Sequence, residues 1–359
     1  MRTLVTGGAG FIGSHIVQAL VARGDQVSVL DNLNQKVHGD EPPNFSENVR
    51  FIHGDLLTPS AVRDAIGDQV DVVFHEAAMV GFGKGGADAQ DYVTTNVIGT
   101  IRLMDAIAKN GNSNHPRFVL ASTMAIYGEG CYVCRACGKV QDGIRRHEDL
   151  ENLKWDPLCV ECGEKLDPCP VTESQPPRPG TIYAITKLNQ ELICMSLGRE
   201  SNIPVVALRY HNVYGPRMPR DTPYAGVASI FKSRLLAGLP PIIYEDGKQL
   251  RDFIHAEDIV QANLIASDTP EEDVAFEAFN VGTGRPHEIG DFARELTKCL
   301  APGVRPEFPG FFRPGDVRHI FADISKIERL GFNPRVSFEE GVSRFAQEPA
   351  RAPPKVVFS

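Results

Sequence analysis

A tyrosine and a lysine near the middle of the chain have the spacing of an acid/base pair. Tyr183 and Lys187 are four residues apart, so in a helix they share a face and the ammonium can approach the phenol. A phenol has a pKa of about 10 and is a poor base at neutral pH. A nearby ammonium, or an oxidised nicotinamide if the chain binds one, would lower that pKa by stabilising the phenolate. The spacing alone is common, but Ser122 and Thr123 end a predicted strand, where a hydroxyl can hydrogen-bond a substrate oxygen beside the phenol.

A glycine-rich segment near the N-terminus predicts a site for a dinucleotide. Residues 6–13, Thr-Gly-Gly-Ala-Gly-Phe-Ile-Gly, follow a predicted strand and open a predicted helix. The glycines permit a tight turn and a close approach of the backbone to a pyrophosphate, and the helix N-terminus offers free N–H groups. Asp31 ends the next strand, 18 residues after Gly13, close to the spacing of an acid that binds the adenosine ribose. A carboxylate there repels a 2′-phosphate, which favours NAD over NADP.

Six of the eight cysteines fall within residues 131–169, which indicates metal binding rather than disulfides. Two copies of the pattern Cys-x-x-Cys-Gly, at residues 134–138 and 159–163, each aim two thiolates at one point. We expect Cys134, Cys137, Cys159 and Cys162 to bind a structural zinc ion, whose four thiolates leave no open position for catalysis. Cys131 and Cys169 could provide a swapped ligand or a second site.

Apolar runs alternate with amphipathic segments along most of the chain. This rhythm predicts an α/β fold with a doubly wound parallel (Rossmann) sheet, a smaller substrate-binding lobe and a Cys-rich zinc-binding insertion. The expected strands are residues 3–6, 26–30, 49–52, 70–75, 117–122 and 205–210, and the main expected helices are 13–23, 96–109, 183–199, 222–237 and 289–300. The expected units are an NAD-binding domain (1–130 and 171–208), a zinc-ribbon-like insertion (131–170), a mainly substrate-binding lobe (209–348, with returns to the first domain near 253–266) and a flexible tail (349–359).

Composition excludes several kinds of partner. The net charge of −9 and the pI of about 5.6 argue against a nucleic acid or an anionic membrane surface, because such binding depends on a basic field. No apolar run approaches the roughly 18 residues of a spanning helix. We therefore expect a cytoplasmic protein, and any anionic substrate must be held by local arginines.

The motifs, taken together, resemble one family over nearly the whole chain outside the insertion and the tail. This family is the extended short-chain dehydrogenases/reductases that act on nucleotide sugars, with UDP-galactose 4-epimerase-like enzymes among them. The insertion, residues 209–212 and residues 222–226 lean toward a dTDP-L-rhamnose 4-epimerase-like branch. The matching segments are residues 7–13, 75–78 (His-Glu-Ala-Ala), 96–100 (Asn-Val-Ile-Gly-Thr), 122–128, 183–187, 209–216 (Arg-Tyr-His-Asn-Val-Tyr-Gly-Pro), 251–255 (Arg-Asp-Phe-Ile-His) and 313–318 (Arg-Pro-Gly-Asp-Val-Arg).

The resemblance assigns roles to individual residues. It implies that Thr123 is the catalytic hydroxyl, Tyr183 the base and Lys187 the residue that holds the nicotinamide ribose. It also implies a homodimer formed through the helices near Asn96 and Tyr183. His211 departs from the family, which usually has Phe there. The implied cofactor-binding residues are Gly7, Gly10, Phe11, Ile12, Gly13, Asp31, Asn32, Asp55, Leu56, Ala77, Ala78, Asn96, Tyr183, Lys187 and His211. The implied substrate-binding residues are Thr123, Asn212, Arg251 and Arg318, of which Asn212 and the two arginines would grip a diphosphate.

Two apolar residues narrow the expected reaction. Sugar dehydratases and decarboxylases of the family carry a Glu, often after an Asp in the dehydratases, where this chain has Ala125 after Met124. An apolar pair cannot protonate a leaving hydroxyl. The resemblance then favours an NAD-dependent nucleotide-sugar 4-epimerase that oxidises C4 transiently and returns the hydride. The alternatives are a nucleotide-4-ketosugar reductase, which consumes external cofactor, and a non-catalytic NAD-binding scaffold.

Overall fold

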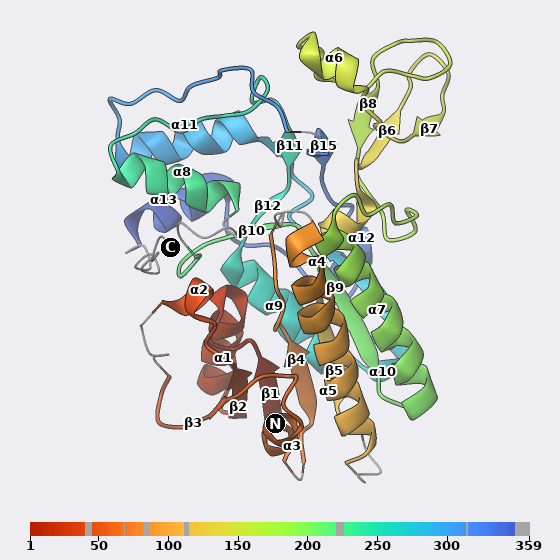
Figure 1. Ribbon diagram of the computed structural model, residues 1–359, viewed down its shortest axis with the longest axis vertical. Coiled ribbons are helices and arrows are strands. Elements are labelled where there is room, and N and C mark those ends of the chain that lie inside the picture. The colour runs from red at the N-terminus through yellow and green to blue at the C-terminus, as the bar shows by residue number, and fades with distance from the viewer. Residues whose placement is uncertain are drawn as a thin grey trace.

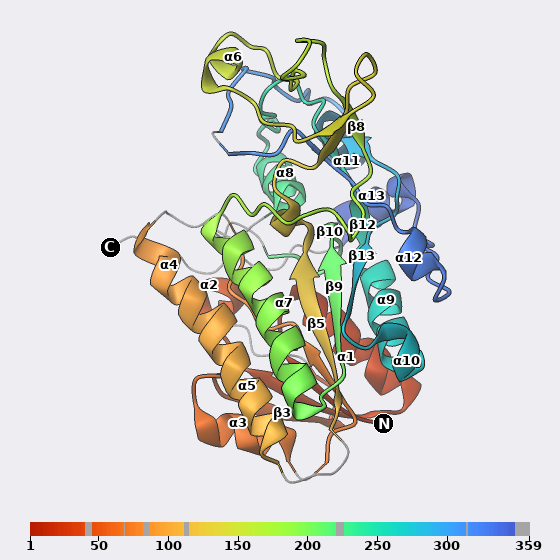
Figure 2. The ribbon, with the colours of Figure 1, turned by 90° about the vertical axis from the view of Figure 1, so that its right-hand side faces the viewer.

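The computed structural model describes residues 1–39, 45–67, 69–81, 86–110, 115–219, 226–313 and 315–348. Its centre is a seven-stranded parallel sheet in the order β13-β9-β5-β4-β1-β2-β3. The strands are continuous apolar runs because both faces of the sheet are covered by helices (Figures 1 and 2). This architecture confirms the expected Rossmann-like α/β fold. The strands are β1 Arg2–Thr6, β2 Gln26–Asp31, β3 Val49–His53, β4 Val72–His75, β5 Arg117–Thr123, β9 Val205–Tyr210 and β13 Glu277–Val281.

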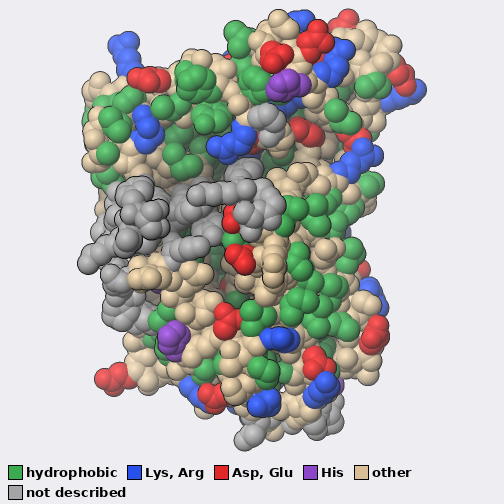
Figure 3. Space-filling model, viewed as in Figure 1, with side chains coloured by type: hydrophobic (Ala, Val, Ile, Leu, Met, Phe, Trp, Pro, Cys, Tyr) green, Lys and Arg blue, Asp and Glu red, His purple; other side chains and the backbone are tan. Residues whose placement is uncertain are grey.

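Two hydrophobic cores hold the helices to the sheet. On one face, α1 (Phe11–Arg23) and α9 (Ala256–Asp268) pack on the sheet through residues such as Ile16 and Ile259. On the other face, α3 (Pro59–Ile66), α5 (Gly99–Ala108) and α7 (Ile182–Ser201) pack through Val62, Leu103 and Cys194. Helices α5 and α7 run side by side (Figure 2). Their outer surface carries a concentration of hydrophobic side chains (Figure 3).

The second lobe is built from helices that form their own core. Helices α8 (Val227–Leu236), α11 (Ile289–Leu300) and α13 (Phe338–Gln347) enclose Phe231, Phe292 and Phe345. The chain returns to the main domain more extensively than expected. Strand β13, which was not among the expected strands, pairs with β9 and covers what would otherwise be its open edge. Small sheets join the lobe: β10 Asn212–Tyr214 with β12 Phe253–His255, and β11 Leu250–Arg251 with β14 His287–Glu288 and β15 His319–Ile320.

The cysteine-rich insertion projects from the end of the molecule opposite the N-terminus (Figure 1). It contains a three-stranded sheet in the order β7-β6-β8 and one short helix. Its elements are β6 Cys131–Val133, β7 Val140–Gln141, α6 His147–Glu151 and β8 Asp167–Cys169. The remaining short elements are α2 Gln35–His38, α4 Gly86–Tyr92, the π-helical turn η1 Val93–Ile98, the 3₁₀ turn η2 Met124–Tyr127, α10 Glu271–Val274 and α12 Ser325–Glu328.

Some sequence expectations fall outside this description. The expected flexible tail (349–359), most of the segment 222–226 and Pro314 lie outside the described residues. Within the described part of the chain, no helix combines the length and the apolar character needed to cross a lipid bilayer.

Candidate active site

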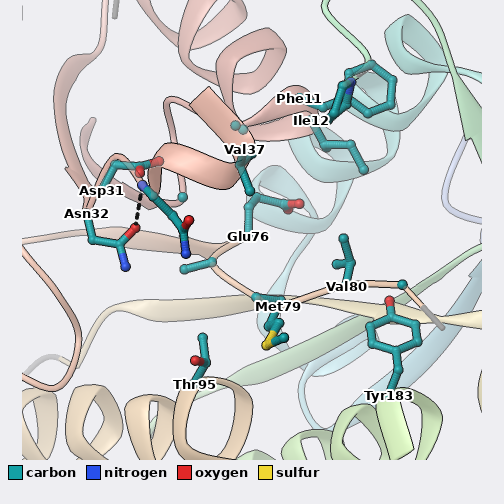
Figure 4. Close-up of a pocket in the computed structure, with 18 of the residues that line it drawn as sticks. Phe11, Ile12, Asp31, Asn32, Val37, Glu76, Met79, Val80, Thr95 and Tyr183 are labelled. Atoms are coloured by element: carbon teal, nitrogen blue, oxygen red, sulfur yellow. Dashed lines mark hydrogen bonds between the residues drawn. The ribbon is translucent and has the colours of Figure 1, made fainter. Parts of the chain in front are cut away.

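A cavity of about 650 Å³ opens at the carboxyl ends of the sheet strands. It lies where β1 has β2 on one side and β4 on the other, the switch point at which open α/β sheets form a crevice. Figure 4 shows Asp31 and Asn32 at one end and Tyr183 at the other, with Glu76 and Met79 between them. The cavity therefore spans the expected cofactor acid and the expected catalytic base.

The glycine turn forms one wall of this cavity. The amide of Gly7 donates to Leu30 O (2.8 Å), and the amide of Gly10 donates to Gly7 O (3.0 Å). Gly7 has a φ of +69°, and a Cβ atom there would lie 2.7 Å from the amide nitrogen of Ala77, so a larger residue does not fit. Helix α1 begins at Phe11 without a side-chain cap. Its first N–H groups remain available to an anion, as a pyrophosphate requires.

The acidic end of the cavity is held rigidly by backbone amides. The Asp31 carboxylate accepts hydrogen bonds from the amides of Ala9 (3.0 Å) and Leu33 (2.9 Å). Asn32 Nδ2 donates to Asp55 Oδ2 (2.7 Å) beside it. These contacts fix the acid at the end of β2, where it can accept from ribose hydroxyls. The cavity wall includes all the expected cofactor residues except Asn96 and Lys187, namely Gly7, Gly10, Phe11, Ile12, Gly13, Asp31, Asn32, Asp55, Leu56, Ala77, Ala78, Tyr183 and His211.

Tyr183 and Thr123 meet at the other end. Thr123 is the last residue of β5, and Tyr183 lies in the first turn of α7, which Thr181 caps by accepting from the amide of Ala184 (3.2 Å). A side-chain hydrogen bond joins Tyr183 to Thr123. Burial raises the pKa of Tyr183 to about 12, although the bond to Thr123 opposes this. The expected lowering of the phenol pKa is thus absent in the protein alone.

Lys187 lies one turn below Tyr183 on the same helix and is buried. Its Nζ donates to Gln190 Oε1, and Gln190 Nε2 donates to Thr100 Oγ1 (2.6 Å). Burial lowers the pKa of Lys187 to about 8. The described lining of the cavity does not include Lys187.

Asn96 orders the site from behind. It lies on the π-helical turn η1, a kind of turn that is frequent at functional sites. Its Oδ1 accepts from the amide of Met79 (2.7 Å), and its Nδ2 donates to Met79 O (2.9 Å) and to Thr186 Oγ1 (3.1 Å). Asn96 is fully buried and is not part of the described cavity lining. It therefore fixes the wall segment at Met79 relative to the helix of Tyr183.

Glu76 is a site residue that sequence reasoning missed. Its carboxylate lines the cavity and accepts from Tyr210 Oη (2.9 Å), which in turn accepts from Asn263 Nδ2 (2.7 Å). Burial raises the pKa of Glu76 to about 7, partly offset by Tyr210 and by the charge of Lys187. The sequence did contain one signal for Glu76: it is an ionisable residue that directly follows β4, a strand buried on both faces.

The two arginines expected to grip a diphosphate lie elsewhere. Arg251 and Arg318 are buried and are not part of the described cavity lining. Arg251 donates to main-chain oxygens, among them Val317 O (2.5 Å). Arg318 donates to Asp246 (2.7 Å) and Glu245 (2.9 Å) of the lobe and to Asp156 of the insertion (2.9 Å). Of the expected substrate residues, Thr123 and Asn212 line the cavity.

The four cysteines of the two repeated turns converge in the insertion. All four sulfur atoms lie within 4.8 Å of one another. The Sγ atoms of Cys134 and Cys162 are 3.6 Å apart, and those of Cys137 and Cys159 are 3.9 Å apart. The turns have the same backbone bond: the amide of Gly138 donates to Cys134 O (2.8 Å), and that of Gly163 donates to Cys159 O (2.9 Å). Cys131 and Cys169 face each other across β6 and β8.

The motifs and the fold agree with the comparison to known proteins. Residues 3–154 and 161–282 match the NAD dependent epimerase/dehydratase family. The chain belongs to this family. As a member of it, the chain is an enzyme of the extended short-chain dehydrogenase/reductase type, as its motifs predicted.

Relatives of known activity cover nearly the whole chain. A dTDP-L-rhamnose 4-epimerase from Burkholderia thailandensis is 35% identical over 95% of this chain and 93% of its own length. The crystal structure of a UDP-glucose 4-epimerase from Thermotoga maritima with UDP-glucose has a TM-score of 0.78 at 30% identity, covering 97% of this chain and 98% of that one. A UDP-glucose 4-epimerase from Thermus thermophilus in complex with NAD has a TM-score of 0.75 at 32% identity, covering 96% and 98%.

Proposed function

We propose that this enzyme is an NAD-dependent nucleotide-sugar 4-epimerase. The observation that carries the proposal is one cavity that joins the glycine turn and Asp31 at one end to the hydrogen-bonded Tyr183 and Thr123 at the other. The geometry of the cofactor end of the cavity fits NAD, because the glycine turn leaves no room for a Cβ atom and the first amides of helix α1 are uncapped. The carboxylate of Asp31 favours NAD over NADP.

The chain's own groups can perform the proton transfer. The glycine turn and Asp31 would hold NAD, which would supply hydride acceptance and return at C4 of the sugar. Thr123 would hydrogen-bond O4, and Tyr183 would remove the O4 proton and later restore it. Lys187 supplies the nearby positive charge, and its buried position keeps that charge poorly screened. Asn96 holds the wall at Met79 in place.

The two positions that follow Thr123 carry no acid, which favours epimerisation over dehydration. Met124 and Ala125 follow Thr123 directly in the turn η2. Neither side chain can donate a proton to a leaving hydroxyl. The relatives that are 4-epimerases support the same reaction.

A ketosugar reductase remains the second candidate, and one experiment separates the two. An epimerase regenerates its cofactor in each cycle, so NAD should co-purify, and nucleotide sugar should turn over without added cofactor. Absorbance of the released nucleotide after denaturation measures the first property, and NMR of the product mixture measures the second. Turnover that requires stoichiometric NADH would identify the reductase instead.

We propose that the insertion binds structural zinc. Zn–S bonds of about 2.3 Å in a tetrahedron require sulfur separations of about 3.8 Å, and the two measured separations are 3.6 and 3.9 Å. The zinc would be held by Cys134, Cys137, Cys159 and Cys162. Metal analysis of protein purified without chelator should find one zinc per chain, and none would contradict the proposal.

We also propose a homodimer through α7 and the neighbouring helices. Ile182, Ile185 and Leu192 are exposed on α7, Leu192 at 58%. A contiguous exposed apolar surface marks an interaction site. Light scattering should give a dimer mass that Leu192→Asp reduces to that of a monomer.

We further propose that the protein is located in the cytoplasm.

For the substrate, we propose a nucleoside diphosphate sugar bound by Thr123 and Asn212. If Arg251 or Arg318 contacts the diphosphate, its hydrogen bonds to protein oxygens must be replaced by hydrogen bonds to phosphate oxygens. Replacing Arg318 by Met should then raise KM for the sugar nucleotide more than it lowers kcat.

A further inference from the structure

Glu76 brings a carboxyl group into the middle of the cavity. Its side chain is half-buried and lines the cavity, and Figure 4 shows it between Asp31 and Tyr183. Its Oε1 accepts from Tyr210 Oη (2.9 Å), whereas Oε2 has no hydrogen-bond partner among the described residues. The two aspartates at the other end differ, because hydrogen bonds reach both oxygens of Asp31 and both oxygens of Asp55. The second oxygen of Glu76 therefore remains for the occupant of the cavity.

The hydrogen bond from Tyr210 does not require a carboxyl group at position 76. A glutamine oxygen would accept the same bond, and the Tyr210 hydroxyl is itself held by the neutral amide of Asn263 on α9 (2.7 Å). An ionised carboxylate that is shielded from water costs free energy unless a positive charge or further donors compensate it. One hydroxyl donor is a small compensation. The ionised form of Glu76 therefore calls for positive charge within the cavity.

The charge of Glu76 acts on the catalytic end of the cavity. Burial has the largest effect on the pKa of Tyr183 and on that of Lys187, and the negative charge of Glu76 disfavours the phenolate and favours the ammonium. Among the described residues, the titratable groups that act on Glu76 are these two side chains of α7 and Tyr210 of β9. In the proposed function, the nicotinamide ring of the cofactor lies beside Tyr183. It carries a positive charge when oxidised and none when reduced.

We propose that the Glu76 carboxyl group faces the nicotinamide half of the bound dinucleotide, is ionised opposite the oxidised ring and takes up a proton when the ring is reduced. The inference rests on the proposed function, because it takes the occupant of the cavity to be NAD. The hydride comes from the sugar and returns to it. On Glu76 one O–H bond forms with a proton from water, and it breaks when the ring is oxidised again.

This coupling has a defined sign. Burial raises the pKa of Glu76 to about 7, so the group titrates near neutral pH. A positive ring lowers the pKa of a neighbouring carboxyl group, so this pKa is lower with the oxidised than with the reduced cofactor. The ionised carboxylate favours the oxidised cofactor, whereas the protonated carboxyl group has no charge with which to distinguish the two. By linkage, the preference for NAD⁺ over NADH must rise with pH.

The test measures this preference in the holoenzyme between about pH 5.5 and 8. The protein is equilibrated with mixtures of NAD⁺ and NADH, and free cofactor is removed by rapid gel filtration. Absorbance of the bound fraction then gives the ratio of the Kd of NADH to the Kd of NAD⁺. Glu76→Gln keeps the acceptor for Tyr210 and removes the titration. Glu129→Gln is the matched control, because burial also raises the pKa of the half-buried Glu129, which does not belong to the described cavity lining.

We expect this ratio to rise about five- to tenfold across the range in the wild type and in Glu129→Gln, as a difference of nearly one pKa unit implies. In Glu76→Gln it should stay nearly constant, because Lys187, with a pKa lowered by burial to about 8, contributes only at the upper end. Tyr210→Phe removes a bond that stabilises the carboxylate, so the rise should move to higher pH.

Two results would contradict the inference in distinguishable ways. A ratio that does not change with pH, or that rises equally in Glu76→Gln, would overturn the inference and leave the proposed function intact. Protein that retains neither form of the cofactor would overturn both.

Discussion

The cofactor cavity and the cysteine insertion are two sites built in different ways. The cavity is made by backbone: a glycine turn, the first amides of α1 and the ends of long buried strands fix its shape. The insertion has strands of only two or three residues. Its buried cluster is Tyr132, Cys134, Cys159 and Leu166, with Cys137 packed against it. A core this small cannot stabilise a fold by burial alone, and the proposed zinc ion would supply the missing free energy.

The two regions also differ in how they join the rest of the molecule. The cavity belongs to the main cores, whereas the insertion meets the second lobe through charged side chains. Arg145 of the insertion donates to Glu245 Oε1 (2.6 Å), and Asp156 accepts from Arg318 Nε (2.9 Å). Charges this well buried depend strongly on their partners. Catalysis and local order should therefore be separable by mutation.

The largest effect should come from Tyr183→Phe. Removing the phenolic oxygen removes the general base, so kcat should fall by about 10² to 10⁴-fold, while the melting temperature and NAD content stay close to those of the wild type. Steady-state kinetics and thermal unfolding measure the two properties. Tyr214→Phe, a change at a buried tyrosine of the lobe core, should retain activity. Comparable activity in Tyr183→Phe and the wild type would refute the assigned role.

For the insertion we expect the opposite result, a loss of local order with little effect on the cofactor site. Cys159→Ser should lose zinc, and amide exchange in residues 131–170 should accelerate by about 10²-fold or more, because the metal holds this unit together. NAD affinity should change less than threefold. Mass-detected exchange with and without chelator makes the comparison, and Cys299→Ser, at an exposed position on α11, is the control. Unchanged exchange after metal removal would show that side-chain packing suffices.

Asp156→Asn should loosen the seam between the insertion and the lobe. The change leaves Arg318 with Glu245 and Asp246 but removes the charge on the insertion side. Because Asp156 is only partly buried, we expect a loss of about 1 to 2 kcal/mol of unfolding free energy. Denaturant unfolding measures it, with Glu148→Gln on the exposed surface of α6 as the comparison. A stability equal to the wild type would mean that the seam is held by packing.

The last prediction concerns the pH dependence of the cavity. Glu76 has a folded pKa raised to about 7 from a usual 4.5, so it stabilises the fold below its unfolded pKa and loses this contribution as the pH rises through 7. Glu76→Gln, measured without cofactor, should gain on the wild type by about 3 kcal/mol between pH 4.5 and 8. The difference between the two proteins isolates this group from the histidines. A constant difference across that range would contradict the raised pKa.

Much of the fold could be predicted because its signals are local. Strand β9 and helix α11 have the expected bounds, and the glycine turn, Asp31 and the Cys-x-x-Cys turns are short patterns whose backbone needs are fixed by neighbouring residues. Strand β13 escaped prediction because it is short and its role is set by pairing with a strand far away in sequence.

The candidate site was predicted less evenly. Tyr183 and Thr123 both line the cavity, but the raised phenol pKa reflects burial that no spacing reveals. Glu76 became visible as a site residue only when strands β4, β5 and β9 aligned their ends.

The sequence by itself determined the family, the parallel sheet, the cofactor turn and the four-cysteine cluster, since each rests on spacing within a few tens of residues. Only the tertiary structure decided which charged side chains are paired with other side chains of the protein. Arg318 is bound to carboxylates from the lobe and from the insertion. The partners of a buried charge come from whichever segments the fold brings beside it. The free energy of burial, rather than the residue type, therefore decides which charged side chains remain free to bind a ligand.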